Sequence, residues 1–316
     1  MQVVAVMGVS GYVGGRLLAR LSTNPGVEAV VGFDLRPLPH PSPEKLTFYR
    51  MDVCDPALRE RLRQHRVDTV VHAAFILYPH PSRLAQMERS NVDGTASVLK
   101  AAAEARVRRL LALSSTTVYG AWPDNPVPLM EEHPPHPNPD YPYGVHKGRV
   151  EAMCRAFGQE HPEIACGVLR PPGIVGPHFQ GPLADLLRGP RAILIDGGHA
   201  LAQFVHEEDL VDLILLALRA DARGVFNATP DDWLPWREIW TGAGKQLMNF
   251  PWSMARPLFG LLWRLGALGC VTHPAQVNLA RFPFVASNEK ARRELGWRPR
   301  HSTLQATQAF LSGGRA

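Results

Sequence analysis

The stretch that decides the fold is Val3-Val-Ala-Val-Met-Gly-Val-Ser-Gly-Tyr-Val-Gly14. A short apolar run, suited to a buried strand, leads directly into a turn with glycines at positions 8, 11 and 14. Apolar residues at helical spacing follow over Tyr12–Leu21, so the turn joins a strand to a helix. In this setting Gly8, Gly11 and Gly14 allow a tight turn, a close approach of the backbone to a pyrophosphate, and close helix–strand packing. The spacing is GxxGxxG rather than the commoner GxGxxG.

Asp34 ends the second predicted strand, 20 residues after Gly14. A carboxylate at that spacing accepts hydrogen bonds from an adenosine ribose and repels a 2′-phosphate. The sequence therefore predicts NAD as the cofactor in preference to NADP, with its pyrophosphate at the N-terminus of the first helix. Two alternatives stay open: Asp34 as a plain loop-capping acid, and Arg36 as a partner for a 2′-phosphate.

The first half of the chain alternates strand patterns with helical ones. Strands are predicted at Val3–Met7, Ala29–Phe33, Leu46–Met51, Thr69–Ala74, Leu110–Ser115 and Ala165–Leu169, and helices at Tyr12–Leu21, Pro56–His65 and Leu84–Ala105. This alternation predicts an α/β fold, a Rossmann-type doubly wound parallel sheet with a smaller C-terminal substrate-binding portion. Residues 1–170 are expected to be mainly the NAD-binding domain. Residues 171–316 are expected to be mainly the substrate-binding portion, with some segments returning to the sheet.

The composition is that of an ordinary globular protein. The 316 residues are 45% hydrophobic and 20% charged, with a formal net charge of +5. No run of Lys and Arg accompanies that charge, so no nucleic-acid partner is expected. The cysteines at 54, 154, 166 and 270 lack CxxC or zinc-like spacing, which indicates reduced thiols in a cytoplasmic protein. Met1–Met7 is interpreted as the first strand and not as a signal peptide.

One segment, Leu258–Val271, resembles a membrane helix. It is shorter than the ~20 residues that a membrane span requires, and Arg264 interrupts it. We therefore expect no stable membrane span and predict a buried or pocket-covering helix, with contact with a lipid surface as the lesser alternative.

Tyr143-Gly-Val-His-Lys147 places a Tyr and a Lys four residues apart. Positions i and i+4 share one face of a helix, so the ammonium can lie beside the phenol. A neighbouring cation favours the phenolate and lowers the pKa of a Tyr from about 10 towards neutral pH. With Ser115 upstream, the pair predicts an enzyme that carries out redox chemistry at a carbinol carbon.

Two neighbouring residues compete for these roles. Tyr141 has Val145 four residues on, so it lacks the cation. Ser114 could replace Ser115, because the alternation of side chains along a strand lets only one of them point into a cleft. The spacing to Val118-Tyr119-Gly120 favours Ser115.

These residues belong to a longer series of motifs. The series also contains Asp52-Val53, His72-Ala-Ala74, Asn91-Val-Asp-Gly-Thr95, Ser114–Gly120, Leu169–Pro177, Phe204–Leu210 and Lys290–Trp297. In this order, and over nearly the whole chain, it resembles the extended short-chain dehydrogenase/reductases, the NAD-dependent epimerase/dehydratase superfamily. The 3β-hydroxysteroid dehydrogenase-like and UDP-glucose 4-epimerase-like branches are the most similar.

The resemblance implies roles for individual residues. Tyr143 would be the general acid/base, Lys147 would lower its pKa and hold the nicotinamide ribose, and Ser115 would donate a hydrogen bond to the substrate oxygen. Asn91 would support the helix and the proton path behind the site. The expected cofactor-binding set is Gly8, Gly11, Tyr12, Val13, Gly14, Asp34, Arg36, Asp52, Val53, Ala73, Ala74, Lys147 and Pro172. The resemblance reads the metal-like run His206–Asp209 as the start of a helix, and no metal is expected.

Two kinds of small-molecule substrate are compatible with these motifs. The first is a hydrophobic secondary alcohol or ketone, favoured because Leu169–Pro177 resembles the hydroxysteroid and dihydroflavonol branch and because Pro251–Val271 would cover an apolar pocket. The second is a nucleotide sugar, which an epimerase or dehydratase would oxidise and then reduce again on a retained NAD. For that reading Arg281-Phe-Pro283 is a poor match to the Arg-x-Gly-Asp-like element, and Thr116-Thr117 stand where a dehydratase usually carries acids.

A third reading, from a different class, is a non-catalytic NAD sensor or scaffold on the same fold. The intact set of Ser115, Tyr143 and Lys147 argues against it. The resemblance also implies a homodimer, paired through the helices near 95–105 and 147–157. Apolar positions such as Val150, Met153 and Phe157 suit that interface, and they suit packing on the sheet equally well.

Overall fold

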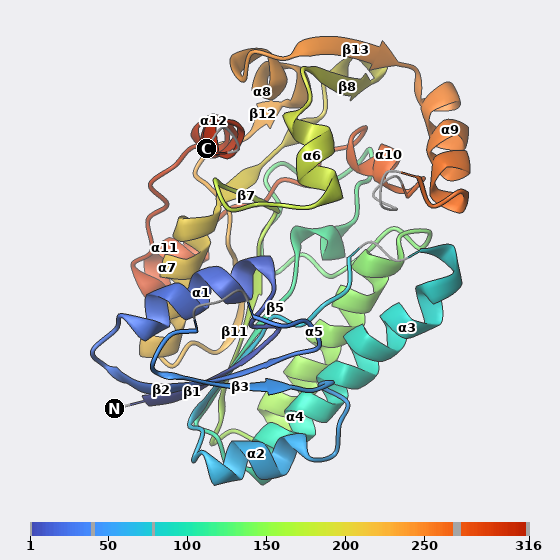
Figure 1. Ribbon diagram of the computed structural model, residues 1–316. Helices are drawn as coiled ribbons and strands as arrows, with labels where there is room; N and C mark the ends of the chain where they lie inside the picture. The colour runs from blue at the N-terminus through green and yellow to red at the C-terminus, as the bar shows by residue number, and fades with distance from the viewer. Residues whose placement is uncertain (1, 39–41, 78–79, 268–272, 314–316) are drawn as a thin grey trace.

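A computed structural model describes residues 2–38, 42–77, 80–267 and 273–313 (Figure 1). Its centre is a parallel sheet of seven strands in the order β11-β6-β5-β4-β1-β2-β3. The strands are β1 Gln2–Met7, β2 Val27–Asp34, β3 Leu46–Arg50, β4 Thr69–His72, β5 Arg109–Leu113, β6 Ala165–Arg170 and β11 Gly224–Asn227. Because the order runs outward in both directions from β1, the predicted doubly wound fold is confirmed.

Helices cover both faces of this sheet, as they must when both faces of the strands are apolar. On one face lie α1 (Tyr12–Ser22), α7 (Glu207–Arg219) and α11 (Glu289–Leu295), and on the other lie α2 (Leu58–Gln64), α4 (Gly94–Glu104) and α5 (Pro142–Glu160) (Figure 1). Side chains alternate along β1, so that Val4 and Val6 join the first core while Ala5 and Met7 join the second.

The single helix predicted over Leu84–Ala105 is interrupted. It consists of α3 (Leu84–Glu88), a π-helical turn (Arg89–Asp93) and α4. α3 is only five residues long, too short for the change of apolar phase at a π turn to show in the sequence pattern. The turn brings Asn91 to face the loop that follows β4.

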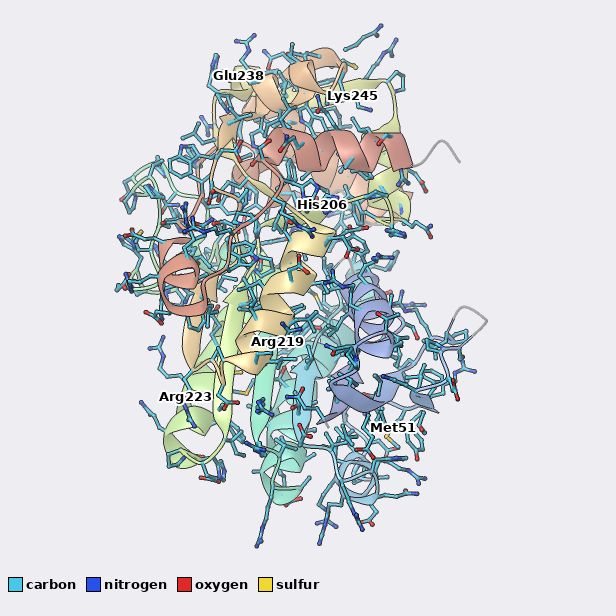
Figure 2. The ribbon with its side chains drawn as sticks, turned by 90° about the vertical axis from the view of Figure 1, so that its left-hand side faces the viewer. Met51, His206, Arg219, Arg223, Glu238 and Lys245 are labelled. Atoms are coloured by element: carbon cyan, nitrogen blue, oxygen red, sulfur yellow. The ribbon has the colours of Figure 1, made fainter. Side chains whose placement is uncertain are left out.

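The second half builds a smaller part above the carboxyl ends of the sheet strands (Figure 1). Its strand pairs are β7 (Gly173–Val175) with β10 (Phe204–His206), β8 (Arg191–Ile195) with β13 (Gln246–Phe250), and β9 (Leu201–Ala202) with β12 (Leu234–Pro235). Its helices are α6 (Pro182–Arg188), α8 (Trp236–Gly242), α9 (Trp252–Arg264), α10 (Gln276–Leu279) and α12 (Thr303–Ser312). In Figure 2, His206 lies where the two parts meet, between Lys245 at the top and Arg219 low on the sheet side.

Two sequence-based expectations concern surfaces. Val150 and Phe157 are buried against the sheet and therefore form core, and Met153 is partly buried beside them. The homodimer therefore stays a prediction, and the burial of Val150 and Phe157 does not support it. Within the described ranges, no helix is both long and apolar enough to cross a membrane. The end of the segment Leu258–Val271, with Cys270, lies outside the described residues.

Candidate active site

The glycine-rich turn has the geometry that a dinucleotide requires. Gly8 has φ of +84°, and a Cβ there would come within 2.8 Å of the backbone of Ala73 and Ala74, which follow β4. A Cβ on Gly14 would overlap the carbonyl oxygen of Gly8. α1 begins at Gly11 with no side-chain cap and no acid in its first turn. Its first amides can therefore receive a pyrophosphate, and the residues present fit NAD.

Asp34 lies at the end of β2 beside this turn. Its carboxylate accepts hydrogen bonds from the backbone amides of Ser10 at 3.1 Å and Arg36 at 2.9 Å. The guanidinium of Arg36 is exposed and its Nε lies 3.7 Å from Asp34 Oδ1. These bonds hold the carboxylate beside the glycine turn, and Arg36 is close enough to serve as its counter-ion.

The remaining predicted cofactor residues follow the neighbouring strands. Asp52 accepts a hydrogen bond from the amide of Cys54 at 2.9 Å, and Val53 is buried against Gly94 of α4. Pro172 follows β6, and the carbonyl of Pro171 before it accepts a hydrogen bond from the amide of Thr116. The Thr116–Pro171 bond joins the ends of β5 and β6, and Val53 packs the segment after β3 against α4.

Tyr143 and Lys147 occupy the first two turns of α5, which begins at Pro142. Lys147 is buried, and its Nζ donates to the carbonyl of Leu113 at the end of β5. The same Nζ lies 2.9 Å from the ring centroid of Phe75 and 5.5 Å from that of Tyr143. The predicted sharing of one helix face is therefore observed.

The predicted pKa shift of Tyr143 is not observed. Burial raises the pKa of Tyr143 well above its ordinary value, with the nearby Tyr141 adding to the effect. Burial also lowers the pKa of Lys147 well below its usual range, partly opposed by the carboxylate of Glu151. The spacing argument considered only the two side chains, whereas desolvation by the surrounding elements outweighs their mutual attraction here.

Ser114 and Ser115 point to opposite sides after β5, as the alternation along a strand predicts. Ser114 donates to the buried carboxylate of Glu151. Ser115 accepts a hydrogen bond at 3.2 Å from the amide of Thr117 and so caps the short helix Thr116–Tyr119. The Ser114 hydroxyl is therefore used in a buried hydrogen bond. The Ser115 hydroxyl only accepts a hydrogen bond here, so its proton stays available for another acceptor.

Asn91 forms hydrogen bonds with the loop that follows β4. Its Oδ1 accepts a hydrogen bond from the amide of Ile76 at 2.8 Å, and its Nδ2 donates to the carbonyl of the same residue at 3.0 Å. This pair of bonds fixes the loop that places Phe75 over Lys147. Asn91 thus bears on the site through the backbone, without contacting Tyr143 or Ser115 in this structure.

A buried ion pair behind the site escaped the sequence analysis. Glu151 and Arg170 are 2% and 0% exposed, and two guanidinium nitrogens of Arg170 contact the carboxylate at 2.6 and 2.9 Å. Arg170 also donates to the hydroxyl of Tyr119 at 2.7 Å. Glu151 follows Lys147 by one helical turn, and that spacing was the available signal. Nothing in the sequence indicated that Arg170 would be its partner.

An aromatic series leads away from Tyr143 and was also missed. The ring centroids of Tyr141 and Tyr143 are 6.0 Å apart, as are those of Tyr141 and His273. The ring of Trp263 on α9 lies 4.6 Å from His273. The second half of the chain therefore contributes aromatic side chains close to the candidate catalytic Tyr.

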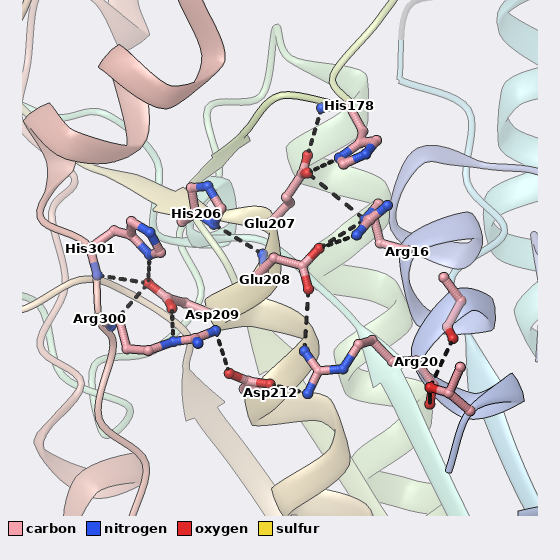
Figure 3. A network of polar contacts seen from close by, with 12 residues as sticks. Arg16, Arg20, His178, His206, Glu207, Glu208, Asp209, Asp212, Arg300 and His301 are labelled. Carbon is pink, nitrogen blue, oxygen red and sulfur yellow. Dashed lines mark hydrogen bonds and ion pairs between the residues drawn. The ribbon is translucent and has the colours of Figure 1, made fainter. Parts of the chain in front are cut away.

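The acidic run after β10 begins α7, as predicted. His206 caps this helix by accepting a hydrogen bond from the amide of Glu208. Figure 3 shows the carboxylates that follow bound by basic side chains from other elements: Glu208 by Arg16 and Arg20 of α1, and Asp209 by Arg300 and His301. Glu207 is bonded to His178 and to the hydroxyl of Tyr12, the residue after Gly11 in the cofactor turn. The acids thus join the two parts of the molecule.

Comparisons with known proteins agree with this geometry. The sequence profile of the NAD dependent epimerase/dehydratase family matches residues 4–229. An uncharacterised protein of Mycobacterium tuberculosis is 30% identical over 325 residues, with 99% of this chain and 84% of the relative covered.

A ketoreductase of Stigmatella aurantiaca, named for 4-hydroxy-2-methyl-3-oxo-4-farnesyl-3,4-dihydroquinoline-1-oxide, is 28% identical over 336 residues, which cover 98% of this chain and 96% of the relative. Among solved structures, the UDP-glucose 4-epimerase of Thermotoga maritima with UDP-glucose has a TM-score of 0.78 at 21% identity and covers 99% of both chains.

The family match includes the glycine turn, Asn91, Ser115 and the Tyr143–Lys147 pair, and it extends past β11. It spans well over half of the chain. The protein therefore belongs to the NAD dependent epimerase/dehydratase family, with NAD as its cofactor.

Proposed function

We propose that the protein is an NAD-dependent oxidoreductase that interconverts a hydrophobic secondary alcohol and its ketone. NAD, when bound, supplies or accepts the hydride. Tyr143 holds the proton of the substrate oxygen, and Ser115 donates a hydrogen bond to that oxygen as negative charge develops on it. Lys147 lies on the same helix face, where it would hold the nicotinamide ribose, and Asn91 positions the loop behind it. With its pKa raised by burial, Tyr143 is protonated at neutral pH and can donate to a ketone.

The observation that carries the choice of substrate is the aromatic series beside Tyr143. Beyond the buried Tyr141, the partly exposed rings of His273 and Trp263 extend this series outward, and such aromatic surroundings favour apolar ligands. The ketoreductase of Stigmatella aurantiaca is named for a farnesylated ketone, which is a substrate of this chemical class.

The alternative is a nucleotide-sugar epimerase or dehydratase, the kind of enzyme that the Thermotoga maritima structure represents. Such a substrate needs cations for its diphosphate. Arg281 stands near the expected position, but its Nε is 2.9 Å from Asp196 and its guanidinium lies over the rings of Trp252 and Phe282. Because Arg281 is already neutralised and stacked, we favour the hydrophobic substrate.

A thermal-shift experiment separates the two substrate classes. NAD is expected to raise the Tm, because a ligand that binds the native state stabilises it. With NAD present, UDP, dTDP and GDP are expected to add no further shift. A clear additional shift with one of these nucleotides would replace the proposed substrate class by a nucleotide sugar.

Asp34 is expected to set the preference for NAD. Hydrogen bonds to a charged group contribute about 1.5–3 kcal/mol, so Asp34→Ala should lower the ratio of NAD to NADP affinity by roughly tenfold to a hundredfold. Titration of both cofactors measures this ratio. The double variant Asp34→Ala/Arg36→Ala is the control, since it should lose any NADP affinity that Arg36 supplies. An unchanged ratio in Asp34→Ala would assign Asp34 to loop capping alone.

A further inference from the structure

Helix α9 exposes an apolar stripe. Met254, Leu258, Leu261 and Leu265 are 63%, 43%, 56% and 71% exposed, and their spacing of four, three and four residues places them on one side of the helix. Figure 1 shows α9 at the edge of the upper part, away from the sheet. A group of large apolar side chains left facing water marks a surface that contacts something else.

The apolar stripe is not part of the hydrophobic core. The opposite side of α9 is the one that packs inward: Ala255 is buried, and Trp252 and Phe259 lie against a small cluster with Ile195 and Val277. α9 is therefore apolar on two sides, of which one is used by the fold. The strand before it continues the exposed surface with Leu247 and Met248.

The chain segment around the stripe carries no acidic residue of its own, although Asp140 and Asp196, from other segments, pair with Arg256 and Arg281. No Asp or Glu occurs from Ile239 to Asn288, although the chain has 29 acidic residues, whereas Lys245, Arg256, Arg264 and Arg281 fall in that range. Arg256 and Arg264 line a groove of about 590 Å³ along α9, together with Trp252, Pro257, Leu261 and Pro274. Arg256 also reaches Asp140 of the neighbouring loop at 3.2 Å.

We propose that α9 docks this surface on an anionic lipid bilayer. An amphipathic helix in the plane of the interface inserts its apolar side while its cations contact lipid phosphates. A second copy of this chain is the less favourable occupant, because two such surfaces would bring their arginines together.

Docking there would also serve the reaction, a consequence that rests on the proposed function. The C-terminal end of α9 carries Trp263, from which His273 and Tyr141 lead to Tyr143. An alcohol or ketone dissolved in the bilayer would then reach the site along apolar and aromatic surface. The substrate class implied is lipid-soluble and not merely apolar.

Vesicle flotation of the full chain tests the docking. Wild-type protein is expected to float with vesicles of equal phosphatidylcholine and phosphatidylserine, less so at high salt, and weakly with phosphatidylcholine alone. Leu258→Glu/Leu261→Glu should reduce binding to the mixed vesicles by more than tenfold. Arg264→Gln should weaken binding and its dependence on salt. Val127→Glu, at a residue that is 44% exposed and distant in sequence, is the matched control and should bind as the wild type does.

Folding and the proposed function are checked separately. All the variants should keep the wild-type circular dichroism spectrum and the Tm increase with NAD, because the altered side chains are exposed. Wild-type protein that stays unbound, or a double variant that binds equally well, would overturn the docking proposal. So would a wild-type dimer that the double variant dissociates, since a second copy would then cover the stripe. A nucleotide-induced Tm shift would refute the substrate class and leave the docking result standing.

Discussion

Replacing Tyr143 by Phe is expected to lower kcat by about 10²–10⁴-fold, the range that positioned general acid/base groups contribute. The ring and its packing remain, and only the phenolic hydroxyl is lost. The hydroxyl is the group proposed to hold the proton of the substrate oxygen. Tyr143 is on α5, whereas the glycine turn joins β1 to α1, so the affinity for NAD should change little.

Steady-state kinetics on a ketone that the wild type reduces, with NAD binding measured by thermal shift, check this expectation. Tyr141→Phe is the matched control. Tyr141 is a buried neighbour whose ring lies 6.0 Å from that of Tyr143, but it has no cation one turn on. Turnover by Tyr143→Phe at the wild-type rate would refute the mechanism and favour the reading of a sensor or scaffold on this fold.

Replacing Arg170 by Met is expected to cost about 3–5 kcal/mol of unfolding free energy, because it leaves a buried carboxylate without its counter-ion. Glu151 is 2% exposed, and the only other side-chain donor it has in the described structure is the hydroxyl of Ser114. The hydroxyl of Tyr119 would lose the guanidinium as well.

Urea denaturation monitored by circular dichroism measures this loss. The double variant Arg170→Met/Glu151→Gln should recover a large part of it, since a neutral side chain needs no counter-ion. Arg149→Met, on the same helix as Glu151, breaks an exposed pair with Glu88 of α3 and should leave the unfolding midpoint unchanged. Equal losses in the single and double variants would mean that the packing of Arg170, and not its charge, stabilises this region.

The site can be predicted from sequence where its parts are local. Gly8, Gly14 and Asp34 lie in one strand–turn–helix–strand unit, so their spacing alone specifies how they meet. Tyr143 and Lys147 share a helix face for the same reason. Ser114 and Ser115 diverge because strand geometry makes them diverge.

The pKa values in the site cannot be predicted from sequence where desolvation by segments distant in the chain determines them. The pair of Tyr143 and Lys147 was expected to lower the pKa of the phenol, but Leu113 of β5 and Phe75 of the loop after β4 contact the amino group of Lys147. The position of Phe75 depends on that loop, which Asn91 fixes from a π turn that the sequence pattern does not show.

By itself, the sequence determined the doubly wound sheet, the cofactor and the family, because apolar periodicity and glycine spacing act within a few turns of chain. Only the tertiary structure decided that Arg170 neutralises Glu151, that Val150 and Phe157 are core, and that one side of α9 faces outward. These features follow from which surfaces non-local segments bury, and burial sets both the cost of a charge and the exposure of an apolar side chain.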